Sequence, residues 1–427
     1  MKRGLAIVFA LILVLALVPG LAAQKKVTVW CWDPAFNIYS MKQAAAVYAK
    51  SHPDFQLDVV EIPDAEITTK ITAGLQAGGQ GLPDIYLCQD FRLEQTLQDY
   101  PKGFVDLKAA GIDFAKFAAY KVGPMTVGKG VYGIPFDTGS TGLWLRADYL
   151  KAAGLKPESY QKAMTWSEVM KLGEIVKAKT GKPLIAYEND SFDTLRIMVQ
   201  SAGGQFFDDK GNLAIRTDVV KKSLEILKQC YDKGLFYTSE GWGNWVSSIN
   251  NDQAAGFLNA IWMIGTVKSK PENKGKWMVV PTPKLEGIKG ASNASNNGGS
   301  SWLVCAQGPN KDLAIDFLKG SWASSSPDAL EFYNTILKGC GAMGTFLPSQ
   351  KGSNYTAKDE FFYGNQAVYK DFAAWMANVP ALRYTPNYQT MRTALFNATL
   401  LYFQGKIKTI DEAITAAENE YKQTVSQ

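Results

Sequence analysis

The chain has 427 residues, of which 46% are apolar, and its formal net charge is +5. A chain of this length exceeds one ordinary core, so we expect two lobes, and the apolar fraction supplies enough material for both. The charge is small and no run of Lys and Arg stands out, which argues against nucleic acid as a partner.

The first 23 residues have the features of a secretory signal peptide. A basic start at Lys2-Arg3 precedes an apolar run over 5–18 and a break of small residues ending at Ala23. The run is too short to span a membrane, and no stop-transfer segment follows it. Cleavage after Ala23, or one residue earlier, would leave a mature chain of net charge +3, since Lys2 and Arg3 leave with the signal. We therefore expect a soluble protein outside the cytoplasm.

Beyond the signal, strand-like and helix-like segments alternate. The predicted segments, in chain order, are a strand at Val27–Cys31, a helix at Phe36–Lys50, a strand at Leu57–Ile62, a helix at Asp64–Gly78, a strand at Pro83–Cys88 and a helix starting at Phe91. This alternation predicts βαβ units and a parallel sheet covered on both faces. Such sheets bind ligands at the carboxyl ends of their strands.

Two later helices are predicted from capping boxes. Thr165–Glu168 begins one of them, and Thr409–Glu412 begins the last helix of the chain. Between these boxes, residues 183–187 and 255–260 resemble strands. Residues 281–301 are rich in Pro, Gly, Ser and Asn, which predicts a turn-rich connection.

One histidine and five widely spaced cysteines limit the chemistry of the chain. His52 precedes Pro53, where a helix should end, so we expect it in a solvated turn. A single histidine argues against a histidine-based triad or zinc site, and no two cysteines have metal-ligand spacing. At most two disulfides could form, but cysteines in apolar runs, such as Cys88 and Cys305, favour buried thiols. We expect no metal and no cofactor.

Several segments form an ordered set along the mature chain. They are Val27–Trp30, Pro83–Ile85, Tyr132–Asp137, Leu143–Arg146, Thr165–Glu168, Ala255–Phe257 with Trp262, Val280–Pro283, Asn297–Ser300 and Leu382–Phe403. This set resembles the extracellular solute-binding proteins of ABC sugar importers (family 1), the group that includes maltose-binding protein. The resemblance implies an α/β, two-lobe periplasmic-binding-protein fold with a hinge and an inter-lobe ligand cleft.

The resemblance also implies a domain organisation and a biological role. After the signal peptide (1–23), the first lobe would hold 24–136 and 283–340, and the second 137–282 and 341–427. The role implied is that of the periplasmic substrate-binding component of an ABC importer, a monomer and not an enzyme, with a carbohydrate ligand and membrane permease subunits as partners. Family members tethered to a membrane usually carry a lipidation cysteine at the mature N-terminus. The first cysteine here is Cys31, so we expect no lipid anchor.

Sugars present hydroxyl rims and apolar C–H faces, so a site needs aromatic rings together with carboxylates, amides or Arg. The end of the first strand offers Trp32 and Asp33, which could reach the cleft or serve only the local turn. Trp30, on the same strand face as Trp32, is expected in the core.

Two further candidates follow the third strand and one lies at the expected crossing between lobes. Asp90 could accept hydrogen bonds from two neighbouring hydroxyls, and Arg92 could contact the sugar rim or pair instead with Glu94 or Asp99. Asp137 could bind ligand, cap a helix or supply a hydrogen bond in the hinge.

The remaining candidates rest on their positions in the family. Trp262 is expected to form one stacking platform, and Tyr388 the opposing one, with Arg383 close by. Gly299 and Ser300 could offer backbone N–H groups to hydroxyls, or form an ordinary turn.

A few neighbouring residues are further candidates. Tyr384 lies next to Arg383, and residues 188–190 follow a predicted strand. Trp242 and Trp245 are expected to be aromatics of an exposed loop.

Two other functions remain open at this point. A secreted glycoside hydrolase also has an aromatic cleft and needs only two carboxylates, although nothing marks such a pair here. A receptor for a non-sugar solute such as a polyamine would need several acidic groups. Arg92 with Arg383 could instead suit an acidic sugar.

Overall fold

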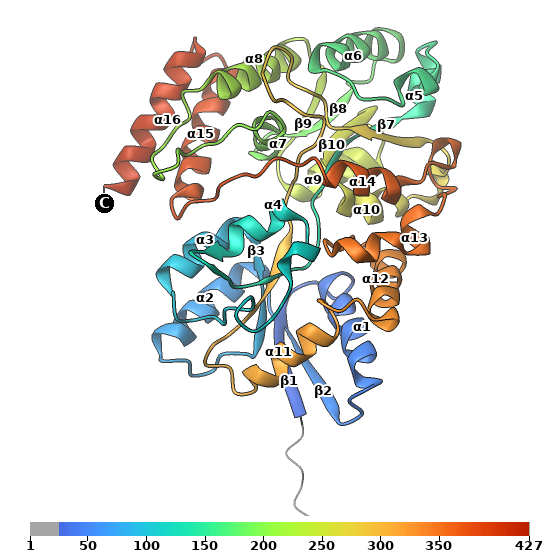
Figure 1. The fold of residues 1–427 in the computed structure, drawn as a ribbon. Helices are drawn as coiled ribbons and strands as arrows, with labels where there is room; N and C mark the ends of the chain where they lie inside the picture. Colours follow the sequence, from blue (N-terminus) through green and yellow to red (C-terminus); the bar gives the residue numbers. More distant parts are fainter. Residues whose placement is uncertain (1–24, 427) are drawn as a thin grey trace, which may run out of the picture.

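The protein has two lobes, each built from helices and strands, stacked one above the other (Figure 1). The structure is a computed structural model and describes residues 25–426. The predicted signal peptide, residues 1–23, lies outside the described residues. Within them, no helix combines the length and the apolar character that crossing a membrane requires.

The first lobe is organised around a five-stranded sheet. Its strands, in spatial order, are β2 (Phe55–Glu61), β1 (Lys25–Cys31), β3 (Ile85–Gln89), β12 (Ser300–Val304) and β6 (Ile134–Pro135). β1 runs parallel to both of its neighbours, and Val29 lies opposite Val59 and Ile85. The predicted parallel arrangement is therefore confirmed for the first three strands. The late strand β12 runs antiparallel to β3 and β6, which the alternation of early elements did not predict.

Helices cover both faces of this sheet. They are α1 (Asn37–Ala49), α2 (Asp64–Gln76), α3 (Asp90–Asp99), α11 (Lys311–Gly320) and α12 (Pro327–Cys340). The apolar spacing predicted the first three, and in α1 the side chains of Met41, Ala44 and Tyr48 are buried as that spacing requires. His52 follows α1 in a turn, half-buried, and its ring stacks on Tyr48 at 3.9 Å between centroids. Shorter elements after α3 are α4 (Ala119–Val122), β4 (Thr126–Val127) and β5 (Gly130–Val131).

The second lobe contains an antiparallel sheet, whose strand directions were not predicted from the sequence. Its strands are β10 (Gly256–Ala260), β7 (Thr141–Arg146) and β11 (Trp277–Pro281), beside a parallel pair of β8 (Ile185–Glu188) and β9 (Phe236–Ser239). The helices are α5 (Ala147–Ala152), α6 (Trp166–Thr180), α7 (Asp193–Ser201), α8 (Asp218–Asp232), α9 (Trp242–Asn250), α10 (Ile264–Lys268), α13 (Ser353–Thr356), α14 (Val368–Met376), α15 (Tyr388–Phe403) and α16 (Ile410–Val425). Long-range pairing decides strand direction, and the local sequence pattern does not contain it.

Both predicted capping boxes are present. Thr165 caps α6 and Thr409 caps α16, and in each box the Glu three residues later returns a hydrogen bond to the cap residue. The tryptophans expected in an exposed loop lie instead on α9. Trp242 is 48% exposed, but Trp245 is buried, because α9 turns its ring toward the core around Phe257.

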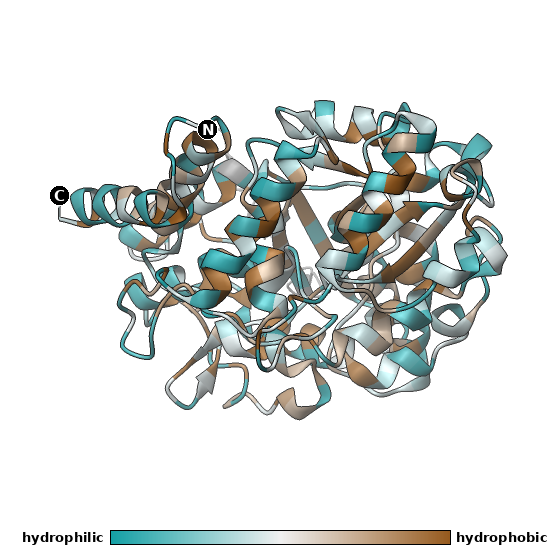
Figure 2. Ribbon diagram, turned by 90° about the horizontal axis from the view of Figure 1, so that it is seen from above, coloured by the Kyte–Doolittle hydropathy of each residue, from teal (hydrophilic) through white to brown (hydrophobic). Residues whose placement is uncertain are grey.

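Each lobe has its own apolar interior. In Figure 2, which views the molecule from above, brown strands lie among helices that carry teal residues. The first core surrounds the five-stranded sheet and contains Leu87 and Trp302. The second core contains Leu143, Leu258 and residues of the last two helices. All five cysteines are free thiols, four of them buried, in agreement with the expectation of small apolar side chains.

Three segments connect the lobes and lie side by side. They follow β6, precede β12 and follow α12, and backbone bridges join Asp137 to Gly344 and Ser140 to Asn296. The N–H of Asn297 donates to the carbonyl oxygen of Gly139 at 2.7 Å. A Cβ atom on Gly139 would collide with the backbone carbonyl group of Asn297, so glycine permits the close approach of the two strands.

Candidate ligand-binding site

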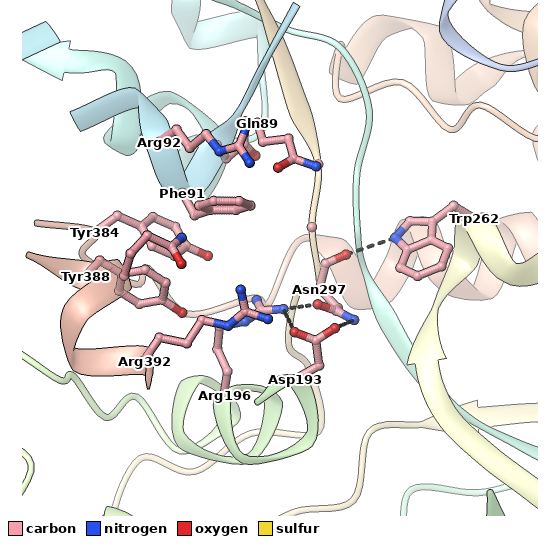
Figure 3. Close-up of a pocket in the computed structure, with 14 residues that line it drawn as sticks. Gln89, Phe91, Arg92, Asp193, Arg196, Trp262, Asn297, Tyr384, Tyr388 and Arg392 are labelled. Carbon is pink, nitrogen blue, oxygen red and sulfur yellow. Dashed lines mark hydrogen bonds and ion pairs between the residues drawn. The ribbon is translucent and has the colours of Figure 1, made fainter. Parts of the chain in front are cut away.

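A cavity of about 360 Å³ opens between the lobes (Figure 3). Both lobes contribute to its wall. Its lining residues are Gln89, Asp90, Phe91, Arg92, Asp193, Arg196, Trp262, Asn297, Gly298, Gly299, Tyr384, Tyr388, Gln389 and Arg392. The segments that supply them are the β3–α3 junction, α7, the turn after β10, the loop before β12, and the start of α15 with the residues before it.

The wall from the first lobe begins at the carboxyl end of β3, where the βα pattern predicts a site. β3 ends at Gln89 and α3 starts at Asp90, so four consecutive residues of the junction reach the cavity. Phe91 presents its ring toward the interior, and Arg92 lies above it (Figure 3). Arg92 forms its ion pair with Asp64 at 3.4 Å, and not with Glu94 or Asp99, the partners considered from the sequence. It also donates a hydrogen bond to the Thr68 hydroxyl at 3.0 Å.

Asp90 is buried and bound by protein groups on both carboxylate oxygens. Oδ2 forms an ion pair with Lys121, which is itself 1% exposed, and Oδ1 accepts a hydrogen bond from the Ser301 hydroxyl at 3.0 Å. Burial raises the pKa of Asp90, and the Lys121 ammonium opposes that shift. The carboxylate therefore anchors this wall of the cavity as well as facing into it. Lys121 gave no signal in the sequence, because a lysine on a short helix is usually solvated.

Gly299 lies directly against this ion pair. Its φ of +104° is in the region that favours glycine, and a Cβ atom there would meet Lys121 and Asp90. The next residue, Ser300, donates its backbone N–H to Asp137 Oδ1 at 2.8 Å. Ser300 and Asp137 are thus committed to the crossing segments and do not line the cavity. Burial, together with the neighbouring Asp90 charge, raises the pKa of Asp137 to about 6, while Lys121 lowers it.

Trp262 forms the opposite wall, on a short 3₁₀ turn that follows β10. Its indole N–H donates to the carbonyl oxygen of Asn297 at 2.9 Å, which fixes the orientation of the ring. The ring of Trp242 packs against it at 5.7 Å between centroids, and Trp245 packs on Trp242 at 5.0 Å. Trp262 is therefore held rigidly before any ligand arrives.

Two tyrosines face Trp262 from across the cavity (Figure 3). Tyr384 and Tyr388 are in edge-to-face contact at 4.8 Å, and both are buried. Among residues 25–426, neither the hydroxyl of Tyr388 nor the side-chain amide nitrogen of the adjacent Gln389 finds a hydrogen-bond partner. Buried polar atoms are rarely left unpaired, so these two groups on the cavity wall favour a polar ligand.

A polar network that sequence reasoning missed forms the floor. Arg196 lies 3.3 Å from Asp193 within α7, and the Asn297 amide donates to Asp193 at 3.0 Å (Figure 3). Arg392 completes the polar lining of the cavity. Burial, together with the charges of Asp193 and Asp190, raises the pKa of nearby Glu188 to about 7, and the charge of Arg392 opposes this shift. Asn297 stood in a predicted turn, but Asp193, Arg196 and Arg392 lie on helices whose local pattern does not distinguish a cleft face from solvent.

The structure brings half of the sequence-predicted residues together. The cavity contains Asp90, Arg92, Trp262, Gly299 and Tyr388, and does not contain Trp32, Asp33, Asp137, Ser300 and Arg383. Asp33 accepts hydrogen bonds from the two backbone N–H groups of Ala35 and Phe36, so it serves the turn into α1.

Trp32 packs at the edge of the first core. Arg383 points to a different part of the cleft and pairs with Asp209 at 2.8 Å.

Two α/β lobes joined by three adjacent crossings, with an aromatic and polar cavity between them, define the class of two-lobed solute-binding proteins. Residues 43–357 match the bacterial extracellular solute-binding protein family, and the chain belongs to this family.

Sequence and structural comparisons agree with this membership. The chain is 39% identical over 399 residues to the lactose-binding protein of Rhizobium radiobacter, covering 92% of each chain. It is 26% identical to the arabinooligosaccharide-binding protein of Bacillus subtilis (strain 168), covering 71% of each. A crystal structure of an extracellular solute-binding protein of family 1 superposes with a TM-score of 0.76 at 19% identity, covering 93% of this chain and 99% of that one. The fold is therefore that of the two-lobe periplasmic binding proteins.

Proposed function

We propose that this protein is the substrate-binding component of an ABC importer and that its ligand is a neutral saccharide. The observation that carries the proposal is the cavity itself. Aromatic rings from both lobes surround a floor of amide, carboxylate and guanidinium groups. The first lobe contributes Phe91, and the second lobe contributes Trp262, Tyr384 and Tyr388. Stacking on ring faces and hydrogen bonding at the rim are the two interactions that a sugar offers.

The acidic groups of the cavity do not favour a cationic ligand. Asp90 is paired with Lys121, Asp193 with Arg196, and Arg92 with a carboxylate outside the cavity. A polyamine would need unpaired acidic groups, and these acidic groups already have cationic partners. The names of two relatives, for lactose and for arabinooligosaccharides, point to the same ligand class.

The same pairing argues against the hydrolase alternative. A glycosidase needs one carboxyl group free to donate a proton and a second free to act as base or nucleophile. The two carboxylates on the cavity wall already have partners. Asp90 is paired with Lys121, and Asp193 is bound by Arg196 and Asn297. Family membership also favours binding without bond cleavage.

Binding would close the lobes around the ligand. The proposed lobes comprise 24–136 with 283–340 and 137–282 with 341–427, joined by the three crossing segments. Hinge closure of this type excludes water and brings groups of both lobes onto the ligand. The closed form would then be presented to the permease subunits in the membrane. We place the mature protein in the periplasm as a monomer without lipid anchor or cofactor and without nucleic acid as a partner.

Isothermal titration calorimetry of the mature protein tests the proposal, with lactose and an arabinotriose as probes. We expect saturable binding of at least one of them with one ligand per chain, and recovery of the sugar intact after prolonged incubation. Spermidine serves as the comparison solute. Hydrolysis products, or binding of spermidine alone, would contradict the proposal.

A further inference from the structure

Asn297 belongs both to the crossing segments and to the wall of the cavity (Figure 3). It lies in the segment that precedes β12 and is only 2% exposed. Its backbone N–H donates to the Gly139 carbonyl oxygen at 2.7 Å, which joins it to a second crossing segment. The residue therefore touches the hinge region and the ligand site at once.

The side chain of Asn297 binds three groups of the second lobe. Its Nδ2 donates to Asp193 Oδ2 at 3.0 Å and to Asn259 Oδ1 at 2.8 Å, and its Oδ1 accepts from the Arg196 guanidinium. Asp193 and Arg196 lie on α7, and Asn259 lies on β10, the strand directly before the turn that carries Trp262. These bonds fix the backbone of the crossing segment against two elements of the second lobe.

The backbone carbonyl oxygen of Asn297 accepts the Trp262 indole N–H at 2.9 Å. The orientation of this ring thus depends on where the backbone of Asn297 lies. An asparagine has a backbone N–H and two amide hydrogens to donate, and in Asn297 all three are bonded to protein groups. Although Asn297 lines the cavity, it has no N–H left to donate to a ligand.

We propose that Asn297 is a positioning residue that holds the Trp262 ring in register with the crossing segments and makes no hydrogen bond to the ligand. The inference rests on the proposed function, in which a saccharide stacks on that ring. Arg196 keeps a bond to the Asn296 carbonyl at 2.9 Å and its ion pair with Asp193, so loss of the Asn297 side chain leaves both of them in place. The effect of such a loss falls on Trp262.

Titration calorimetry of the mature chain with lactose tests this assignment in two backgrounds. We expect Asn297→Ala to weaken lactose binding about fivefold, because the indole N–H loses a fixed acceptor and the ring can turn. Trp262→Phe has no N–H for Asn297 to hold. In that background Asn297→Ala should therefore change the affinity by less than about twofold, since two substitutions that act on one interaction are not additive.

A spectroscopic measurement reads the ring directly and without ligand. In protein labelled with 5-fluorotryptophan, the ¹⁹F resonance that disappears in Trp262→Phe belongs to Trp262. We expect this resonance to shift in Asn297→Ala. Asn297→Asp is a second variant that keeps the side-chain shape and the acceptor for Arg196 but loses both amide donations, and it should act in the same direction.

Asn334→Ala is the matched control for a general loss of stability. Asn334 is a buried asparagine of α12 whose side chain donates to the Ser353 hydroxyl at 3.1 Å and accepts from the Asn354 N–H at 2.7 Å. It does not line the cavity between the lobes. This variant should unfold at a lower temperature yet keep the lactose affinity and the Trp262 resonance of the unsubstituted protein.

Two results would overturn the inference. One is an unchanged Trp262 resonance with unchanged affinity in both Asn297 variants. The other is an equal loss of affinity in the unsubstituted and Trp262→Phe backgrounds, because Asn297 would then act on the ligand itself. If lactose does not bind at all but the resonance shifts in the Asn297 variants, the choice of saccharide under the proposed function is contradicted and the positioning of the ring stands.

Discussion

Trp262 is the residue whose role was expected from the sequence and whose setting the structure explains. The indole N–H bond to Asn297 and the packing of Trp242 hold its ring at the cavity wall. A rigid aromatic anchor loses little conformational freedom on binding, which is why such residues dominate affinity.

We expect Trp262→Ala to weaken saccharide binding by on the order of 2–4 kcal/mol, as measured by titration calorimetry with lactose or whichever probe binds. Trp262→Phe is the control, since it keeps an aromatic ring face while it loses the hydrogen bond to Asn297. It should retain most of the affinity. Equal affinity in Trp262→Ala and the unsubstituted protein would exclude the ring as a stacking platform.

Asp137 sits where the crossings meet, and its raised pKa makes stability depend on pH. The pKa is about 6 in the folded protein against an ordinary value of 3.8, so the folded state holds the proton more tightly than the unfolded chain does. Its stabilising contribution is complete below about pH 4 and is lost as the pH rises through 6.

The isosteric variant Asp137→Asn mimics the protonated form at every pH. Relative to this variant, we expect the unsubstituted protein to lose up to about 3 kcal/mol in its free energy of unfolding between pH 4 and pH 7.5. Urea unfolding at the two pH values gives the comparison. A constant difference between the two proteins would show that Asp137 does not titrate in this range.

At the scale of single elements, helix boundaries follow from a few side chains. In α16, Thr409 Oγ1 accepts from the Glu412 N–H at 3.2 Å, and the Glu412 carboxylate accepts from the Thr409 N–H at 2.9 Å. The helix then buries Ala413 and Ala417 in the second core. Two local signals, the cap and the apolar face, thus agree on one helix.

We expect Thr409→Ala to lower the free energy of unfolding by about 1 kcal/mol, because backbone N–H groups at the start of α16 lose their acceptor. Thr424→Ala, in the last turn of the same helix, removes a hydroxyl that bonds only to the Glu420 carbonyl. Urea denaturation should show a clearly smaller loss for this control. Similar losses in both variants would mean that the cap has no special role.

For the whole molecule, three adjacent crossings restrict the relative motion of the lobes to bending around one region. Gly139 allows two of these strands to touch, and the ion pair of Asp90 with Lys121 lies beside them. A ligand between the lobes contacts both of them only when they approach each other. It therefore binds the closed state more tightly than the open state, and this difference in affinity shifts the protein toward closure.

Small-angle X-ray scattering should therefore show a smaller radius of gyration at saturating saccharide than in its absence. The Trp262→Ala variant at the same sugar concentration provides the control and should remain in the more extended state. An unchanged radius in the saturated unsubstituted protein would contradict closure.

Several helices of both lobes could be predicted from the sequence because their signals are local. Apolar spacing marked α1 and α2, and capping boxes marked α6 and α16, each within a few residues of the observed bounds. The direction of β12 and the antiparallel sheet around β7 could not be predicted from periodicity, since strand pairing joins segments far apart in the chain.

The site divides in the same way. The sequence by itself determined the alternating elements and the strand end at Asp90, because these depend on neighbours along the chain, whereas the aromatic after β10 was expected from the family resemblance. Only the tertiary structure decided that Lys121 neutralises Asp90, that Asp33 serves its own turn, and that Arg196 faces the cavity. Charge pairing and burial depend on which distant segments come into contact. The folding of the lobes and their packing against each other determine these contacts, and the local sequence pattern does not contain them.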